Sequence, residues 1–278
     1  MSGITLISLP GKVYSGVLER RVRGIVEPRI QEEQCGFRPG RGTVDQLYTL
    51  SWVFEGAWEF AQPVHMCFVD LEKAFDRVPW GVLISRCSHG VEGVQFGDLR
   101  IGSLLFADDV VLLASSARDL QRSLDRFAAP CEAAGMKIST SKSEAMVLNR
   151  KKVKCLLRVK EEILPQVEEF KYLGVLFTSE GRMEQEIDRR IGAVSAVMRT
   201  LHRSVVVKRE AKLSIYRSIF VPTLTYGHEL WVMTERTRSR VQAAEISFLR
   251  RVAGLSPREG EKLCHPGGAR SRAAAPPC

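Results

Sequence analysis

Long apolar runs and paired cysteines are missing from this sequence of 278 residues, and we expect no secretory leader in it. The longest apolar run, Val110–Ala114, is far shorter than the roughly eighteen residues that span a bilayer, so we expect no membrane-spanning segment. The seven cysteines form no Cys-x-x-Cys pair, which argues against a disulfide framework or a zinc cluster and favours a reducing compartment. Residues 1–10 contain no basic stretch before an apolar one, so we expect a nuclear or cytoplasmic protein rather than a secreted one.

The composition is that of a globular chain, with 45 % apolar and 26 % charged residues, and it excludes a fibre or a disordered tail protein. The net charge of +9 is unevenly distributed. Residues 1–180 carry 23 Lys and Arg against 23 Asp and Glu, whereas residues 181–278 carry 18 against 9. A basic region of this kind suits a polyanionic partner such as nucleic acid, although a solvated basic face would have the same composition.

The apolar pattern predicts helices in the first sixty residues, strands in the middle and helices again after Gly181. Strands on either side of a helix, followed by a helical region, indicate an α+β fold. From Pro257 onward the sequence has no periodicity, and we expect it to be disordered. The expected elements are a helix capped by Thr43, a strand at Val64–Val69, a helical turn at Leu71–Asp76, a strand at Arg100–Phe106, a strand at Val110–Ala114, a helix at Arg118–Ala134 that ends at Gly135, and an extended run at Phe170–Phe177.

Three aspartates, Asp70, Asp108 and Asp109, stand at the ends of these predicted strands. If the strand before Asp70 lies beside the hairpin that carries Asp108 and Asp109, the carboxylates converge and repel one another unless cations lie between them. Hard oxygen ligands of this kind suit Mg²⁺, and two such ions support phosphoryl transfer. The alternative is that Asp108 and Asp109 only form a turn and that Asp70 only caps a helix, both common uses of Asp.

The sequence around these acids resembles that of a known family. Phe68–Asp76 and Phe106–Asp109 resemble the first and third palm motifs of reverse transcriptases. Gln34–Arg41 is similar to the fingers loop of that family, Gly135–Met146 to the segment after the aspartate hairpin, and Phe170–Gly174 to the primer-grip turn. Five motifs in the family's order make a specific match. Over roughly residues 3–255, the chain therefore resembles the reverse transcriptase domain of a non-LTR, LINE-type retrotransposon.

This resemblance implies a right-hand polymerase fold of fingers, palm and thumb, and it implies roles for the acids. Asp70 and Asp108 would be the principal Mg²⁺ ligands, with Mn²⁺ as a substitute ion, and Asp109 would be an accessory acid. Lys142 would protonate the pyrophosphate leaving group, although an exposed lysine in a Ser-Lys-Ser turn is the plainer interpretation. The implied partners are an RNA template, a DNA primer and deoxynucleoside triphosphates, with no membrane; the sequence identifies no protein partner.

The remaining implied roles concern the nucleotide and the primer. In the fingers loop, guanidinium groups would bind the triphosphate, although a solvated loop would also contain arginines. An aromatic residue would close over the sugar, although it could equally be a core residue. These assignments are Arg38 and Arg41 for the triphosphate, Phe75 for the sugar, Tyr172, Leu173 and Gly174 for the primer grip, and Arg189, Arg190, Arg199 and Arg203 for the nucleic-acid backbone.

The chain departs from the family between Trp80 and Arg100. The resemblance predicts further helices there, together with a Gln-Gly turn and a Pro-Leu-Ser-Pro stretch that hold the template base and the nucleotide, and neither motif is present. We therefore expect an internally deleted and truncated copy. The expected parts are partial fingers at 1–60, a palm at 61–180 with a deletion near 81–99, a basic thumb-like region at 181–256 and a disordered tail at 257–278.

Three functions fit these observations. The first is RNA-directed DNA polymerisation by two Mg²⁺ ions. The second is nucleic-acid binding without catalysis, because the missing turn would hold the template. The third is a two-metal phosphodiesterase, since clustered acids also serve nucleases, although the sequence offers no histidine base near the acids.

Overall fold

The computed structural model describes residues 7–30, 33–72, 93–203 and 209–253, and divides the chain into two compact units, Met1–Met183 and Glu184–Cys278. We call them the sheet unit and the helical unit. The described part of the sheet unit combines helices with antiparallel strands, and that of the helical unit contains helices. This mixture of helix and sheet agrees with the α+β expectation.

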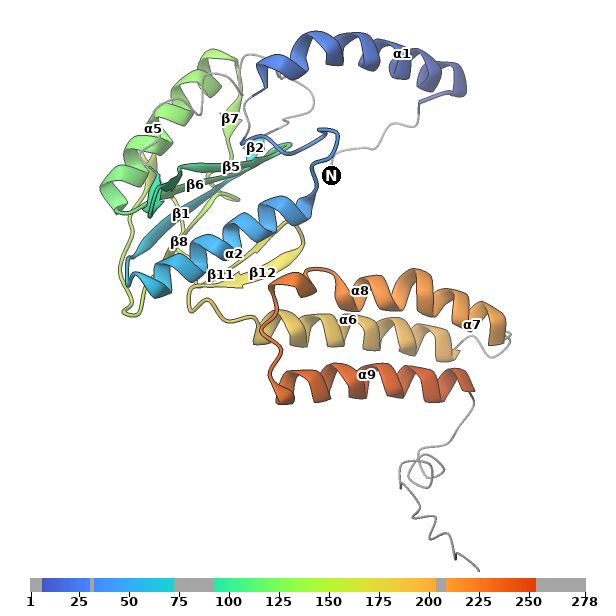
Figure 1. The fold of residues 1–278 in the computed structure, drawn as a ribbon. Coiled ribbons are helices and arrows are strands. Elements are labelled where there is room, and N and C mark those ends of the chain that lie inside the picture. Colours follow the sequence, from blue (N-terminus) through green and yellow to red (C-terminus); the bar gives the residue numbers. More distant parts are fainter. Residues whose placement is uncertain (1–6, 31–32, 73–92, 204–208, 254–278) are drawn as a thin grey trace, which may run out of the picture. The chain divides into compact units, whose positions relative to one another are not determined.

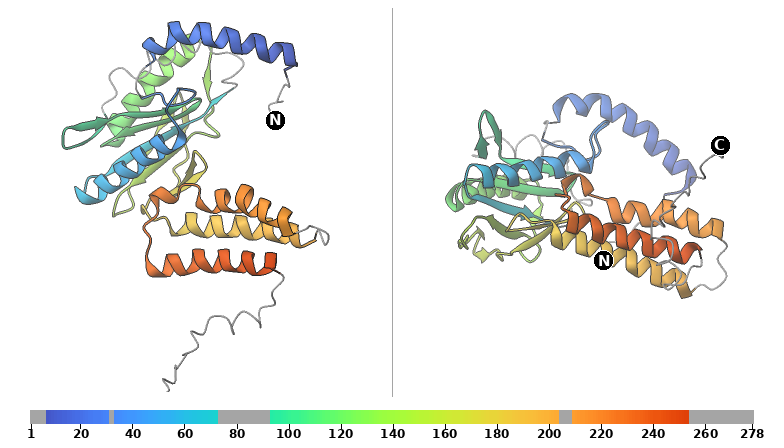
Figure 2. Two further views of the ribbon diagram at one scale, coloured as in Figure 1. Left: turned by 45° about the vertical axis from the view of Figure 1, so that its right-hand side comes forward. Right: turned by 60° about the horizontal axis from the view of Figure 1, so that its bottom comes forward.

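A four-stranded antiparallel sheet forms the centre of the sheet unit (Figure 1). Its strands are β1 (Val64–Val69), β5 (Ser103–Phe106), β6 (Asp109–Ala114) and β8 (Glu144–Leu148), in the order β5-β6-β1-β8. All six residues of β1 are buried, because the strand has a neighbour on each side and a helix covers each face of the sheet. The two helices, α2 (Thr43–Glu59) and α5 (Ala117–Ala133), lie on opposite faces in every view (Figure 2).

Helix α5 follows directly from its local sequence. The Ser116 side chain accepts a hydrogen bond from Asp119 N at 3.1 Å and caps the first turn. The helix ends before Gly135, which adopts the left-handed conformation (φ 75°) that terminates many helices. Its apolar stripe packs on the sheet through Leu120, Leu124, Phe127 and Cys131. The predicted helix at 118–134 is confirmed within a residue.

Helix α2 covers the other face with buried side chains that include Leu50 and Phe54. Phe54 packs on Phe177 with ring centroids 5.4 Å apart. The helix begins at Thr43, but Gly42 is the N-cap, and its N–H donates to Asp45 Oδ2 at 2.7 Å. The expectation that Thr43 is the cap was therefore wrong by one residue, because the Asp45 carboxylate supplies the capping interaction.

Short hairpins and a long N-terminal helix complete the described part of the sheet unit. The expected helical turn at Leu71–Asp76 was wrong at its start, because Leu71–Glu72 is a strand that pairs with Lys137–Ile138. The expected strand at 100–106 is divided at Gly102. The elements are α1 (Leu9–Val26), η1 (Glu27–Arg29), β2 (Leu71–Glu72) with β7 (Lys137–Ile138), β3 (Val94–Phe96) with β4 (Leu99–Ile101), β9 (Arg158–Val159) with β10 (Glu162–Ile163), and β11 (Glu169–Tyr172) with β12 (Val175–Thr178).

The helical unit packs around an apolar core. Its elements are α6 (Glu184–Arg203), α7 (Arg209–Ile215), the π-helix η2 (Tyr216–Phe220), α8 (Val221–Thr225), η3 (His228–Leu230) and α9 (Glu235–Ala253). The aromatic rings of Tyr216, Phe220 and Phe248 pack against one another at centroid distances of 4.5–5.5 Å. The helices that the sequence predicts after Gly181 are present, and Val194 and Met198 from α6 complete this core.

Some sequence expectations lie outside the described residues: Phe75, most of the proposed deletion near 81–99, and the tail from 257. Among the described residues, no helix combines the length and the apolar character needed to cross a membrane.

Candidate active site

The three aspartates meet at one end of the sheet, where β1 stops and β6 starts. Val69 pairs with Val110, so Asp70 follows β1 beside Asp109, the first residue of β6. Partial desolvation, together with the smaller effects of the negative charges of Asp108 and Asp70, raises the pKa of Asp109 to about 6. The side chains therefore interact electrostatically, as the sequence analysis expects of converging carboxylates.

The turn that presents Asp108 is strained. Phe106 pairs with Asp109, so the β5–β6 hairpin has the two-residue loop Ala107–Asp108. Ala107 has a φ of 56°, a conformation that favours glycine. The β3–β4 hairpin has the same loop length and places Gly97 (φ 60°) at the equivalent position. The non-glycine residue before Asp108 is thus a backbone outlier of the kind that clusters at functional sites.

Asp70 is held by the segment between β7 and β8. Its backbone N–H donates to Ser143 Oγ at 3.0 Å, and its carbonyl oxygen accepts from Ser139 N at 2.8 Å. Lys142 Nζ lies 3.5 Å from Asp70 Oδ2, an atom that is shielded from solvent and has no hydrogen-bond partner. Because the Lys142 side chain is 71 % exposed, this ion pair contributes little to stability and can open readily.

The aspartate cluster is compatible with a divalent cation. Across the described residues, no group of three or more His, Cys, Asp or Glu side chains forms a site that could hold a metal ion by itself. Mg²⁺ does not require one, because it keeps several waters and binds through one or two carboxylates together with substrate phosphates. The unbonded Oδ2 of Asp70, next to two further carboxylates, is the type of donor that such an ion takes.

The predicted primer-grip residues lie on the β11–β12 hairpin. Leu173 (φ 45°) and Gly174 (φ 84°) form its two-residue turn, and positive φ at both positions matches the twist of the strands. Tyr172 is buried, and its ring centroid lies 6.3 Å from that of Phe68 in β1. Burial raises the pKa of Tyr172, and the charge of Asp109 adds to the effect. Tyr172 therefore supports the hairpin from within the core.

The two fingers-loop arginines have different surroundings. Arg38 Nε lies 2.9 Å from Glu27 Oε1, Arg38 Nη1 donates to Gln34 O at 3.3 Å, and the side chain is only 16 % exposed. Arg41 is exposed to solvent. A phosphate contact by Arg38 would require it to leave Glu27, whereas Arg41 needs no such rearrangement.

The expected backbone-binding arginines also differ from one another. Glu186 is fully buried and receives bonds from Arg189 Nε at 2.7 Å and Arg190 Nε at 2.5 Å. Arg190 is also buried, and its guanidinium lies over the Tyr226 ring, 4.9 Å from the centroid. Arg190 neutralises a buried carboxylate, so the expected contact of Arg190 with a nucleic-acid backbone would require it to leave Glu186. Arg199 is exposed, and the side chain of Arg203 lies outside the described part of the chain.

Sequence reasoning missed the residues that support the aspartate turn from the N-terminal segment. Gln34, Gly36 and Gln46 contact the β5–β6 hairpin, although they are about sixty to seventy positions away in the chain. No local sequence pattern predicts such long-range contacts, since a buried glutamine has no characteristic spacing.

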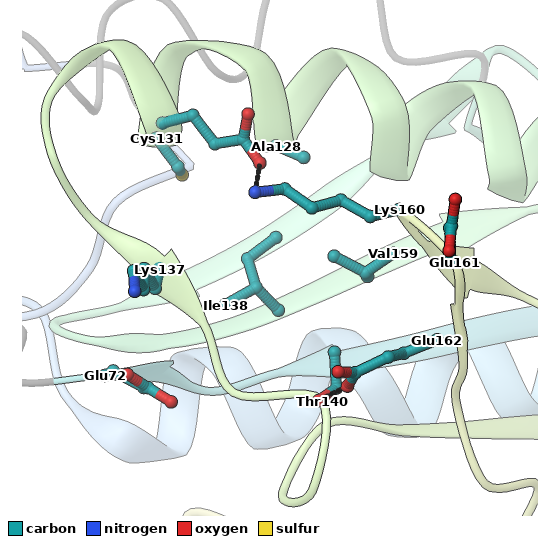
Figure 3. Close-up of a pocket in the computed structure, with 11 residues that line it drawn as sticks. Glu72, Ala128, Cys131, Lys137, Ile138, Thr140, Val159, Lys160, Glu161 and Glu162 are labelled. Atoms are coloured by element: carbon teal, nitrogen blue, oxygen red, sulfur yellow. Dashed lines mark hydrogen bonds and ion pairs between the residues drawn. The ribbon is translucent and has the colours of Figure 1, made fainter.

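A separate cavity of about 550 Å³ opens beside α5, β7 and the β9–β10 hairpin (Figure 3). Lys160 Nζ lies 2.9 Å from Glu132 Oε1 at its wall. Glu72, Lys137, Ile138 and Thr140 line this cavity and belong to two of the motifs, but none of the individually assigned site residues lines it.

Comparison with known proteins identifies the family. Residues 94–177, from β3 to β12, match the family model described as reverse transcriptase (RNA-dependent DNA polymerase). This segment contains Asp108, Asp109, Lys142 and the turn at Leu173 and Gly174. Residues 94–177 therefore belong to the reverse transcriptase family, and the chain as a whole is similar to proteins of non-LTR retrotransposons.

Several transposon proteins are similar to this chain. It is 27 % identical over 159 residues to a transposon-derived protein of Caenorhabditis elegans, covering 55 % of the chain and 57 % of that protein. It is 23 % identical over 322 residues to the "Probable RNA-directed DNA polymerase from transposon BS" of Drosophila melanogaster, covering 90 % of the chain and 36 % of that protein. It is 34 % identical over 107 residues to the Pol polyprotein of element R2 of Nasonia vitripennis, covering 34 % of the chain and 10 % of that protein.

These alignments carry two further facts. The chain spans from about a tenth to just over half of the length of these relatives. The alignment with the transposon BS protein covers 322 positions, more than the 278 residues of the chain. Within the aligned region, that relative therefore has residues that are absent from this chain.

Proposed function

We propose that this chain is the RNA-directed DNA polymerase portion of a retrotransposon protein, and that it adds deoxynucleotides to the 3′-hydroxyl of a primer. The observation that carries the proposal is the convergence of Asp70, Asp108 and Asp109 at one end of two paired strands. Asp70 and Asp108 would hold Mg²⁺, or Mn²⁺ in its place, and Asp109 would be the accessory acid. The bound ions would activate the primer hydroxyl and stabilise the charge of the transferred phosphoryl group.

The residues around the acids would bind the nucleotide and the primer. Lys142, which can leave Asp70 at little cost, would protonate the pyrophosphate as it departs. Arg41 would bind the triphosphate, and Arg38 would join it only after releasing Glu27. The turn at Leu173 and Gly174 would approach the primer end, with Tyr172 as its support.

The arrangement of the chain would follow the polymerase hand. The N-terminal segment up to about residue 60 would form partial fingers, the central sheet would be the palm, and the helical unit would be the thumb. Arg189, Arg199 and Arg203 of α6 would face the phosphate backbone of the template and primer, whereas Arg190 would stabilise the helix through Glu186.

A primer-extension assay on an RNA template tests the proposal. Asp108→Ala should abolish Mg²⁺-dependent incorporation of deoxynucleotides. Asp98→Ala is the matched control, because Asp98 occupies the same position of the two-residue turn in the β3–β4 hairpin, and it should leave incorporation unchanged. Incorporation that survives Asp108→Ala would refute the assignment.

A second function is favoured by the alignment that is longer than the chain. We place the proposed deletion near positions 81–99. If the deleted residues include those that hold the template base, the chain would bind nucleic acid without catalysis. Its affinity for an RNA–DNA hybrid would then fall steeply with salt, as phosphate contacts require, while no deoxynucleotide is incorporated. A salt titration run alongside the extension assay separates the two functions.

A further inference from the structure

The side-chain amide of Gln34 joins the N-terminal segment to the turn that carries Asp108. Gln34 Oε1 accepts a hydrogen bond from Ala107 N at 3.1 Å, and Gln34 Nε2 donates to Ala107 O at 3.4 Å. The same Oε1 accepts from Gly36 N at 2.7 Å. One amide thus satisfies both backbone polar groups of the residue that precedes Asp108, and it also fixes its own loop.

The backbone of this segment approaches the turn as closely as a glycine permits. A Cβ atom on Gly36 would lie 2.1 Å from Ala107 N and 2.8 Å from Ala107 Cα. Gln34 itself is only 3 % exposed, so water does not compete for its hydrogen bonds. The contact is therefore a tight, dry junction between residues 34–36 and Ala107.

Neighbouring bonds keep Gln34 in place. Cys35 N donates to Leu105 O at 2.9 Å, and Gln34 forms a parallel bridge with Leu105 in β5. Gln46 Nε2, from α2, donates to Glu33 O at 3.0 Å and to Leu105 O at 3.3 Å. The segment is thereby anchored along β5 before it reaches the turn.

We propose that Gln34 is a positioning residue, which holds the backbone of Ala107 so that the Asp108 carboxylate keeps its orientation toward Asp70. Ala107 has a positive φ that an alanine does not favour, so the turn needs external bonds to remain in this conformation. Gln34 supplies them from the segment that also carries Arg38 and Arg41. This inference rests on the proposed function, because it assigns Asp108 as a metal ligand.

Two measurements on the full chain test it, both with Gln34→Met. The first is a Mn²⁺ titration followed by electron paramagnetic resonance, in which loss of the supporting bonds should weaken binding about 10-fold. The second is hydrogen–deuterium exchange over residues 102–112, in which the Ala107 amide should exchange faster because it has lost its acceptor.

The matched control is Gln166→Met. Gln166 also bridges a backbone N–H and a backbone C=O, accepting from Cys155 N at 2.9 Å and donating to Val153 O at 2.8 Å, but it does not contact the turn. Gln166→Met should lower the melting temperature by about as much as Gln34→Met does, and it should leave both the Mn²⁺ affinity and the hydrogen–deuterium exchange at residues 102–112 unchanged. If Gln34→Met does not fold, Gln34→Glu keeps the acceptor for Ala107 N but loses the donor to Ala107 O, so Mn²⁺ binding should still weaken even though the Ala107 amide keeps its acceptor.

The outcomes separate this inference from the proposed function. Wild-type affinity for Mn²⁺ together with wild-type exchange in Gln34→Met would overturn the positioning role. Mn²⁺ binding that Asp108→Ala does not weaken would refute Asp108 as a ligand. In that case the exchange measurement, which needs no metal, still decides whether Gln34 holds the turn.

Discussion

Replacing Gly36 by alanine should push the aspartate turn out of place. The added Cβ would lie 2.1 Å from Ala107 N, whereas ordinary contacts begin near 3.4 Å, and the atoms that it meets are backbone atoms that cannot rotate away. The turn or the loop must therefore move by roughly 1 Å, which weakens the bonds from Gln34 to Ala107. Overpacking of this kind costs about 1–3 kcal/mol, and each weakened hydrogen bond adds about 1 kcal/mol.

We expect the free energy of unfolding of Gly36→Ala to fall by about 3 kcal/mol. For a unit the size of Met1–Met183, this corresponds to a melting temperature lower by roughly 6–12 °C, which circular dichroism measures directly. If the proposed function holds, a shift of about 1 Å should also reduce primer extension by about 100-fold.

The control is Gly16→Ala, the same chemical change in helix α1. A Cβ on Gly16 meets nothing within 4 Å, and alanine is the better helix former, so this variant should be neutral or more stable by about 0.5–1 kcal/mol. If Gly36→Ala and Gly16→Ala melt at the same temperature, the close approach at Ala107 does not exist in solution and the reasoning fails.

Three further predictions concern stability. Glu186→Gln should lower the free energy of unfolding of the helical unit by about 3 kcal/mol, because it leaves the buried Arg190 without its counter-charge. Urea unfolding measures this loss, and the control Glu184→Gln, at an exposed position, should change stability by less than about 0.5 kcal/mol; equal losses in the two variants would contradict the role of Glu186. Burial lowers the pKa of His65 below 6.5, so below about pH 6.5 the unfolded chain binds a proton that the folded chain does not, and the free energy of unfolding should fall as the pH drops. In His65→Leu the free energy of unfolding should depend less on pH in this acidic range, and an unchanged pH dependence would contradict the role of His65. Phe127→Ala should cost about 3–5 kcal/mol in the same urea assay, because its side chain fills the core between α5 and the sheet, and a loss below about 1 kcal/mol would show that the site is not packed.

Most of the regular elements near the site were predictable because their signals are local. Ser116 and Gly135 mark the two ends of α5, and the apolar run of β1 leads directly to Asp70. The prediction was wrong where pairing overrode local preference. Leu71–Glu72 looks like the start of a helix, yet it pairs with β7, whose residues lie more than sixty positions later.

The candidate site was predictable in its acids and not in their surroundings. Asp70, Asp108 and Asp109 were identified from strand ends and from motif spacing, and the structure brings them together. The burial of Arg190 over Tyr226 could not be predicted, because a helical arginine opposite an apolar stripe is usually solvated. The ion pair between Arg38 and Glu27 could not be predicted either, since the two residues belong to different elements.

The sequence by itself indicated the resemblance to reverse transcriptases, most of the regular elements near the site and the three candidate acids, because these depend on local composition and on residues that are close together in the chain. Only the tertiary structure decided which groups hold the acids in place. Gln34 and Ala107 are 73 positions apart, and their contact exists because β5 folds back beside the N-terminal segment. A contact of that range depends on the packing of the whole unit, and no short stretch of sequence encodes it.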